Sequence, residues 1–214
     1  MRGKLLDLFC KASGASVGYA RAGFEVVGVD HEPQPRYPYE FIQADVFELE
    51  IDFLKSFDAI HASPPCQRYS QCTPPEHRDK HPDSIAPVRD ILKSTGKPYI
   101  IENVPGARHE LQHPVMLCGT MFGLNIYRHR YFEIWPQLEG LIPPCHHKGK
   151  PVLITGTHRR KTGRFEYNVQ ECRDASGIPW MTRKELDQAI PPAYTEWIGE
   201  RIQLWEELQP PNGL

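Results

Sequence analysis

Short apolar runs recur along the first half of the chain, and each ends at a polar residue or a proline-rich turn. Runs of about 4–8 residues between turn residues are typical of strands buried in a sheet. A stretch of small residues from Gly14 to Gly23 lies between the first two runs and predicts a helix that ends at the glycine. The predicted strands cover residues 4–9, 25–30, 41–45, 58–63 and 98–103.

Two later segments have helical spacing. Asp83 can cap a helix on which Ile85, Val88 and Leu92 recur, and a last helix begins at Pro192 and carries an apolar stripe. Strands that alternate with helices predict an α/β fold, a doubly wound and mostly parallel sheet. The stripe of the last helix consists of Tyr194, Trp197, Ile198, Ile202, Trp205 and Leu208.

The composition of the chain changes at residues 141–165, which contain six Lys or Arg, three His and no acidic residue. This pattern indicates a basic, partly extended insertion, although a solvated basic hairpin gives the same composition. We therefore expect a main domain at 1–138, a small insertion at 139–172, and a segment at 173–214 that packs back on the main domain.

Composition excludes several classes of protein. With 214 residues, 40% hydrophobic and 24% charged residues, the chain has the composition of one main globular domain. A net charge of −2 excludes a polycation that coats DNA nonspecifically. Asp7 interrupts the first apolar run, which argues against a signal peptide or membrane span and for a cytoplasmic protein. The sequence leaves the oligomeric state open, and we favour a monomer.

The six cysteines include no CxxC pair, which favours reduced thiols. We expect no metal site. The alternative is a zinc site made of Cys145, His146, His147 and Cys172, whose spacing is not diagnostic.

The candidate functional residues lie where predicted strands end. In doubly wound sheets, ligands bind beyond the carboxyl ends of the strands. Asp7 to Gly14 form a turn into a helix N-terminus where backbone amides and Phe9 could hold a nucleoside. Asp30 ends the second strand, where an acidic residue can bind the hydroxyls of a ribose. The alternative is that glycine tightens the turn and Asp30 is a cap.

Cys66 follows a buried run directly after Pro64 and Pro65, which fix the turn and hold the thiol at the edge of the sheet. The alternative is a small core hydrophobe, the commoner role of cysteine. Glu102 ends another buried run, and it needs a structural partner or a ligand because an unpaired buried carboxylate is costly. Arg128 and Arg130 would point to one face, where they could meet phosphate or stiffen the loop of Cys66.

In this order, the segments resemble the DNA (cytosine-5)-methyltransferase family, as a compact member with a short target-recognition region. The resemblance spans nearly the whole chain and implies the methyltransferase variant of the doubly wound sheet. The cofactor would be S-adenosylmethionine, with Phe9 on its adenine, Asp30 on its ribose and Asp45 near the adenine amino group. The matched stretches are 7–18, Asp30, Asp45, Pro65-Cys66-Gln67, Glu102-Asn103-Val104, Arg128-x-Arg130 and 188–192.

The resemblance implies methyl transfer to carbon 5 of cytosine in DNA. The Cys66 thiolate would add to carbon 6, and Glu102 would bond to N3 and the exocyclic amine. Arg128 and Arg130 would favour the thiolate. The DNA would be a duplex with a flipped cytosine or a single strand. The other residues implied are Asp7, Cys10, Gly14 and Pro65 for the cofactor, and Gln67, Ser70, Asn103, Arg159 and Arg160 for the substrate.

The chain departs from the family pattern in places. Lys11 and Ser13 stand in a turn that usually carries more glycine, Ile126 replaces a glutamine, and the recognition region is short. The short region suggests a phage or mobile-element origin. The biological role stays open between restriction–modification, phage protection and regulation. The alternative functions are modification of cytosine in RNA, modification of a free pyrimidine nucleotide, and a catalytically silent DNA-binding accessory protein.

Overall fold

A seven-stranded sheet in the order β3-β2-β1-β4-β5-β7-β6 forms the centre of the computed structural model. The structure describes residues 3–138, 142–154 and 166–208. The strands are β1 (Lys4–Leu8), β2 (Glu25–Asp30), β3 (Glu40–Gln43), β4 (Ala59–Ala62), β5 (Tyr99–Asn103), β6 (Val115–Leu117) and β7 (Arg130–Trp135).

Five of these strands are parallel, and β7 runs antiparallel to both β5 and β6. Leu8 pairs with Val29 on one side and with Ala62 on the other, so β1, β2 and β4 end at the same edge of the sheet. Glu102 pairs with Phe132, which places the start of β7 beside the end of β5. The predicted doubly wound, mostly parallel α/β fold is confirmed.

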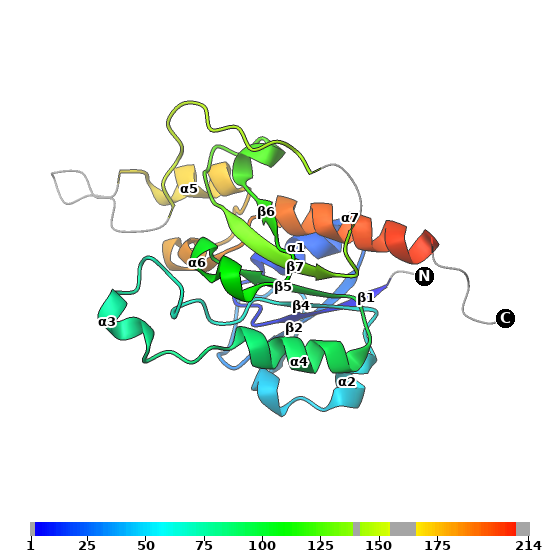
Figure 1. The fold of residues 1–214 in the computed structure, drawn as a ribbon. Helices are drawn as coiled ribbons and strands as arrows, with labels where there is room; N and C mark the ends of the chain where they lie inside the picture. Colours follow the sequence, from blue (N-terminus) through cyan, green and yellow to red (C-terminus); the bar gives the residue numbers. More distant parts are fainter. Residues whose placement is uncertain (1–2, 139–141, 155–165, 209–214) are drawn as a thin grey trace.

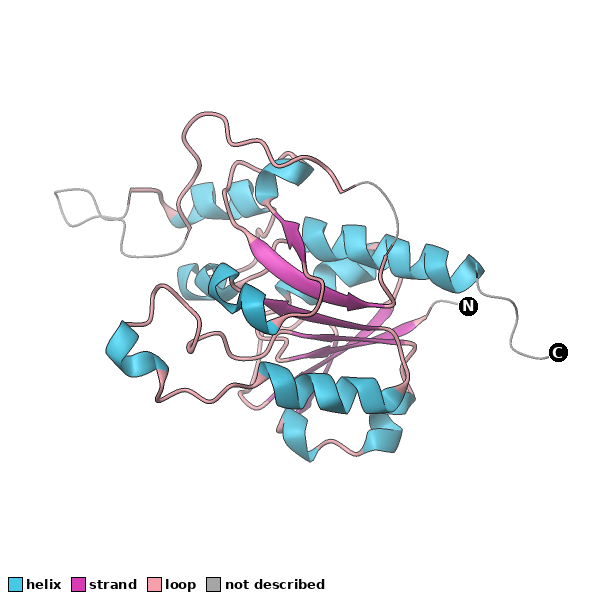
Figure 2. Cartoon of the chain, viewed as in Figure 1, coloured by secondary structure: helices cyan, strands magenta, loops and turns pink. Residues whose placement is uncertain are grey.

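Helices cover both faces of the sheet (Figures 1 and 2). Helices α2 and α4 lie on one face, and α1 and α7 lie on the other. The helices are α1 (Gly14–Arg21), α2 (Ile51–Lys55), α3 (Pro75–Arg78), α4 (Ile85–Thr95), α5 (Val169–Ser176), α6 (Arg183–Gln188) and α7 (Pro192–Leu208), with short 3-10 helices at Val46–Glu48, Pro105–Glu110 and Gly119–Phe122.

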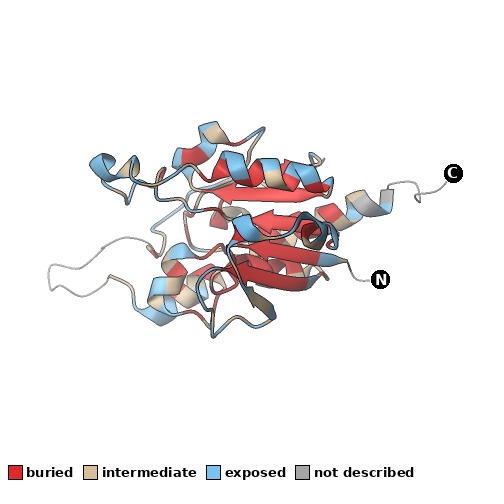
Figure 3. Cartoon of the chain, turned by 90° about the horizontal axis from the view of Figure 1, so that it is seen from below, coloured by how far each residue is buried: buried red, intermediate tan, exposed pale blue. Residues whose placement is uncertain are grey.

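Alternation along the strands divides the core into two layers. Leu6 packs in the layer under α2 and α4, whereas its neighbour Leu5 packs in the layer under α1 and α7. The central strands are buried on both faces, which explains their continuous apolar runs (Figure 3).

The last helix joins the second layer, because Tyr194, Ile198 and Ile202 are buried there beside Tyr19 of α1. The side chain of Leu208 lies outside the described residues. Residues 142–154, the described part of the basic insertion, contain no helix or strand. None of the described helices has the length and apolarity to cross a membrane. The proposed domain limits at 138 and 172 stay a prediction.

Candidate active site at the carboxyl edge of the sheet

Cys66 lies in a fixed loop just beyond the end of β4, and its side chain is half-buried rather than sealed in the core. The carbonyl oxygen of Cys66 accepts hydrogen bonds from the backbone N–H groups of Tyr69 (3.0 Å) and Ser70 (2.9 Å). From the end of β5, the Asn103 Nδ2 donates to the carbonyl oxygen of Pro64 at 3.1 Å. These bonds hold the loop from both sides, with the half-buried Cys66 side chain at the carboxyl edge of the sheet.

Glu102 and Arg130 form a buried ion pair at the same edge. The Arg130 Nε lies 3.0 Å from the Glu102 Oε1, and the two side chains are 13% and 8% exposed. The antiparallel pairing of β5 with β7 brings these residues together. Burial raises the pKa of Glu102, while Arg130 and a hydrogen bond from Ser63 oppose the rise. Oε1 has no hydrogen bond of good geometry among the described residues, so it can accept a ligand.

The pKa of Cys66 is raised, by burial first and then by the charge of Glu102. Arg130 and Arg128 lower it, as the sequence suggested, but they do not overcome these two effects. The two arginines therefore act on the Cys66 pKa in the expected direction, but the net pKa stays above the ordinary value of a thiol. Ionisation of the thiol needs a further change at the site, such as neutralisation of Glu102.

Arg128 has a different environment from Arg130. It is buried, its Nη2 donates to the carbonyl oxygen of Asp187 at 2.8 Å, and its own carbonyl oxygen accepts from the Tyr194 hydroxyl at 2.6 Å. Burial lowers the pKa of Arg128 to about 9. These bonds connect the chain just before β7 to α6 and to α7, which indicates an architectural role.

The turn after β1 has an unusual backbone. Phe9, Lys11 and Ser13 have positive φ angles of 60°, 45° and 75°, a conformation that favours glycine. Two of these are the positions where the family pattern has more glycine. The Lys11 backbone N–H donates to the Asp30 Oδ2 at 3.1 Å and its Nζ lies 3.3 Å from Oδ1, so the turn is closed onto the end of β2.

Asp7 is buried in β1 with an unsatisfied oxygen. Its Oδ2 accepts from the Ser16 hydroxyl, whereas Oδ1 has no hydrogen-bond partner among the described residues. Burial raises the pKa of Asp7 to about 7, and the negative charge of Asp30 adds to the rise. A buried carboxylate of this kind fits a cationic ligand, which would favour its ionised form.

An aromatic pair lies near Asp45 on the other side of this turn. Phe9 and Phe47 meet edge to face with their ring centroids 6.4 Å apart, and Phe47 is 48% exposed. Asp45 is exposed, and its Oδ1 accepts from the Phe47 backbone N–H at 2.9 Å. Phe47 was not among the cofactor residues predicted from the sequence, although an aromatic residue two positions after Asp45 was a usable signal.

Other predicted cofactor residues have structural reasons for their identity. A Cβ at Gly14 would overlap the backbone oxygen of Ile190, so glycine is needed for the close approach of the segment before α7. The side chain of Cys10 is buried and faces Gly28 of β2. Pro65 is exposed in the Cys66 loop.

The predicted substrate residues are placed only in part. Gln67 is exposed, and the Ser70 hydroxyl accepts from the Cys72 backbone N–H at 3.1 Å. Asn103 is buried and holds the Cys66 loop instead of facing outward. Arg159 and Arg160 lie outside the described residues.

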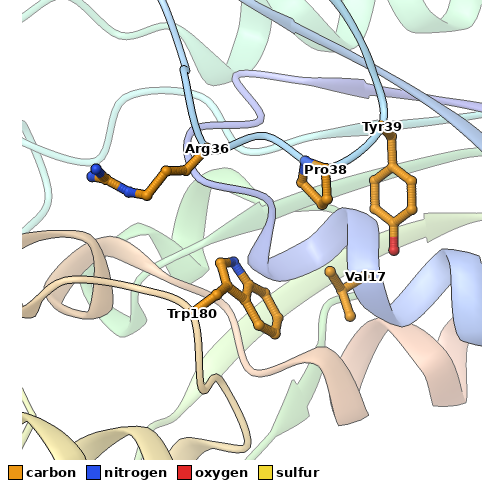
Figure 4. Close-up of a pocket in the computed structure, with 5 residues that line it drawn as sticks. All are labelled: Val17, Arg36, Pro38, Tyr39 and Trp180. Atoms are coloured by element: carbon orange, nitrogen blue, oxygen red, sulfur yellow. The ribbon is translucent and has the colours of Figure 1, made fainter.

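A cavity of about 410 Å³ lies between α1 and the chain that leads to β3 (Figure 4). It is lined by Val17, Arg36, Pro38, Tyr39 and Trp180, and none of the predicted site residues contributes to it.

The zinc site considered from the sequence does not form with the residues named there. Cys172 is buried in a different cluster, where the Arg183 Nη1 donates to its sulfur at 3.1 Å. Cys145 and His147 are close to each other but have other neighbours, Cys118 and His129.

Comparisons with known proteins agree with this architecture. The sequence model of the family described as C-5 cytosine-specific DNA methylase matches residues 3–117. The Type II methyltransferase M.FnuDI of Fusobacterium nucleatum is 32% identical over 75 residues, which cover 32% of this chain and 22% of that protein. The chain therefore spans about a fifth of the length of this curated relative.

Two solved structures share the fold. The Entamoeba histolytica methyltransferase EhMeth has a TM-score of 0.64 at 13% identity, with 98% of this chain and 100% of that chain covered. A protein encoded within an E. coli prophage, described as a DNA modification methyltransferase, has a TM-score of 0.50 at 23% identity, with 72% and 54% covered. Because the family model matches more than half of the sequence, the chain belongs to the C-5 cytosine-specific DNA methylase family.

Proposed function

We propose that this protein transfers a methyl group from S-adenosylmethionine to carbon 5 of cytosine in DNA, through a covalent adduct on Cys66. The observation that carries the proposal is the meeting of three chain segments at one sheet edge. The Cys66 thiol follows β4, Glu102 lies in β5, and Arg130 begins β7 and pairs with Glu102. Membership of the cytosine methylase family supports the choice of base.

Cys66 supplies the nucleophile. Carbon 5 of cytosine is a weak nucleophile, and bond formation between the Cys66 sulfur and carbon 6 breaks the aromaticity of the ring. Carbon 5 then carries the electron pair that would form the new bond to the methyl carbon. The bond from that carbon to the sulfonium sulfur would break at the same time, and the donor would leave as the neutral thioether S-adenosylhomocysteine. A base removes the proton from carbon 5, and that electron pair expels the Cys66 thiolate. Because Cys66 is half-buried, a cytosine ring can reach its sulfur, while the hydrogen bonds of the loop keep the sulfur in a fixed position.

Glu102 stabilises the ring during this addition. Addition at carbon 6 places negative charge on the N3 side of the cytosine, where a proton or a hydrogen-bond donor is needed. The raised pKa of Glu102 favours the protonated acid, which can donate to N3. When Glu102 is neutral, its charge no longer raises the pKa of Cys66, whereas Arg130 and Arg128 still lower it. Base binding and thiol ionisation are thus coupled.

The residues around the turn after β1 fit S-adenosylmethionine, which supplies an electrophilic methyl group when bound. The orphaned Asp7 Oδ1 suits its positive charges, and the exposed ring of Phe47 beside Phe9 and Asp45 suits an adenine. Asp30 is set to hold the ribose. Its Oδ1 is shared with the Lys11 ammonium, which must therefore move aside or contact the ligand as the ribose enters.

DNA is the proposed partner, with the target cytosine flipped out of a duplex or presented in a single strand. Gln67 and Ser70 lie in the loop after Cys66, where they would meet the base or its sugar. We also propose Arg159 and Arg160 for phosphate contacts on the basis of charge. The type II name of the Fusobacterium relative supports a restriction–modification role.

Nucleoside mass spectrometry tests this function. The protein is incubated with labelled S-adenosylmethionine and with duplex DNA, single-stranded DNA or RNA, and the digested nucleosides are weighed. We expect label in 5-methylcytosine from DNA, and none with the Cys66→Ser variant, which should still bind the cofactor and unfold like wild type. Label only in RNA, or unmodified cytosine in every DNA while the cofactor is demonstrably bound, contradicts the proposal.

A further inference from the structure

Four side chains that can bind a metal converge at a place outside the Cys66 site. Cys118, His129, Cys145 and His147 each offer one ligand atom, and these atoms all lie within 4.8 Å of one another. We call this group the Cys2His2 cluster. It is the richest group of sulfur and imidazole ligands in the described part of the chain.

The fold brings these ligands together from three segments. Leu117 of β6 pairs with Arg130 of β7, so the residues next to them, Cys118 and His129, come side by side at the end of the ladder. Cys145 and His147 arrive from the connection between β7 and α5. Cys118 is buried, His129 and Cys145 are half-buried, and His147 is exposed. The cluster is therefore reached from solvent on one side.

The distances agree with the edges of a zinc tetrahedron. With Zn–S near 2.3 Å and Zn–N near 2.0–2.1 Å, tetrahedral coordination puts sulfur and nitrogen ligands about 3.5 Å apart. The Cys145 Sγ lies 3.6 Å from the His129 Nε2 and 3.3 Å from the His147 Nε2, and the Cys118 Sγ lies 3.4 Å from the His147 Nε2. Both histidines present the same nitrogen, Nε2, to the sulfurs.

Neighbouring groups hold the ligands in place, as they do around structural metal sites. The Thr120 hydroxyl donates to the Cys118 sulfur at 3.5 Å and lies 3.7 Å from the Cys145 sulfur. The ring of Tyr127 stacks on the exposed His147 ring, with centroids 3.9 Å apart and planes at 4°. These contacts orient an imidazole that would otherwise be free in solvent.

We propose that the Cys2His2 cluster binds one Zn²⁺ ion as a closed structural site. Two thiolates and two imidazoles in a tetrahedron are the ligand set that zinc prefers, and four protein ligands leave no open position for chemistry. This ligand set differs from the one considered from the sequence, and it goes beyond the expectation that the chain has no metal.

A metal bound to His129 would affect the candidate active site, because His129 lies between two residues of that site. His129 stands between Arg128, whose carbonyl oxygen is held by Tyr194, and Arg130, which pairs with Glu102. A zinc ion on His129 would fix this segment to the chain at Cys145 and His147. It would thereby attach the connection from β7 to α5 to the main sheet.

Metal analysis of the full chain with matched variants tests the proposal. Protein purified from zinc-containing medium is measured by plasma mass spectrometry. We expect about one zinc per chain in wild type, in His146→Ala and in Cys72→Ser, and loss of most of the zinc in His147→Ala and Cys145→Ser. His146 and Cys72 are exposed and outside the cluster, so they control for the loss of any histidine or cysteine.

Wild-type protein gives a second readout if the variants do not fold. Co²⁺ added to reduced, metal-free protein should produce the absorption bands of a tetrahedral ion with two thiolate ligands. X-ray absorption of the zinc form should show two sulfur and two nitrogen ligands. Three results would overturn the proposal. The first is wild type that has neither stoichiometric zinc nor cobalt–thiolate bands, and the second is equal zinc in His147→Ala and wild type. The third is a Cys118–Cys145 disulfide in protein isolated without oxidant.

Discussion

Replacing Asp7 by Asn should change the pH dependence of stability. The Asp7 pKa is raised from 3.8 to about 7 by burial, so its ionisation opposes folding. At about 1.36 kcal/mol per pH unit, the ionised group costs about 4 kcal/mol in the protein without ligands. Because the pKa of Asp7 is higher in the folded state than in the unfolded state, protonated Asp7 contributes its full amount to the unfolding free energy below about pH 4. This contribution is lost as the pH rises from there through about 7.

Between about pH 5 and about pH 8, wild type should lose about 3 kcal/mol more unfolding free energy than Asp7→Asn, which has no charge to bury. For a chain of this size the difference corresponds to about 6–12 °C in Tm. Asn can still accept the hydrogen bond from Ser16, so the local contact is kept. Urea unfolding of both proteins at each pH measures the effect. Parallel curves for the two proteins would refute the reasoning.

The same residue predicts a proton linkage in cofactor binding. A cationic ligand near the Asp7 Oδ1 favours the ionised carboxylate, so S-adenosylmethionine should bind more tightly as the pH rises through about 7. Calorimetry in buffers of different ionisation enthalpy should detect proton release on binding near neutral pH. Asp7→Asn should bind the cofactor more weakly and release no such proton. Identical proton release in both proteins would exclude Asp7 from the binding step.

Two further changes test other parts of the structure. Arg130→Ala should lower kcat/KM by about 10²-fold. Because Arg130 lowers the pKa of Cys66, the variant should also move the alkaline rise of the pH–rate profile to higher pH. An unshifted profile would argue against this role of Arg130. Gly18→Ala should cost about 3 kcal/mol in urea unfolding, because its Cβ would overlap the Thr195 hydroxyl in the α1–α7 contact. Gly96→Ala meets no neighbour and should cost only about 1–2 kcal/mol for its positive φ; equal losses in the two glycine variants would contradict the packing argument.

The central strands were predictable because they are buried on both faces, and continuous apolar runs leave a clear pattern. The run at 98–103 corresponds to β5, and the run at 4–9 corresponds to β1. Strand β6 was missed because three residues at the edge of a sheet are too few to show a period. Helices α5 and α6 were missed, although Asn168 with Glu171 and Thr182 with Glu185 form capping boxes that sequence can reveal.

The site was predictable only as a list of strand ends. The sequence placed Cys66 and Glu102 at such ends, but the Glu102–Arg130 pair depends on β7 running antiparallel beside β5. The raised pKa of Cys66 depends on burial, which no local pattern reports. The Cys2His2 cluster joins residues from three distant segments, so its spacing along the chain resembles no zinc motif.

Trapping the covalent intermediate tests the central claim most directly. The protein is incubated with S-adenosylmethionine and DNA that contains 5-fluorocytosine, whose fluorine cannot leave as a proton does, so the adduct persists. We predict a DNA–protein complex that survives denaturation and maps by peptide mass spectrometry to Cys66, with none in Cys66→Ser. An adduct on another residue, or 5-methylcytosine formed by Cys66→Ser at the wild-type rate, would contradict the account.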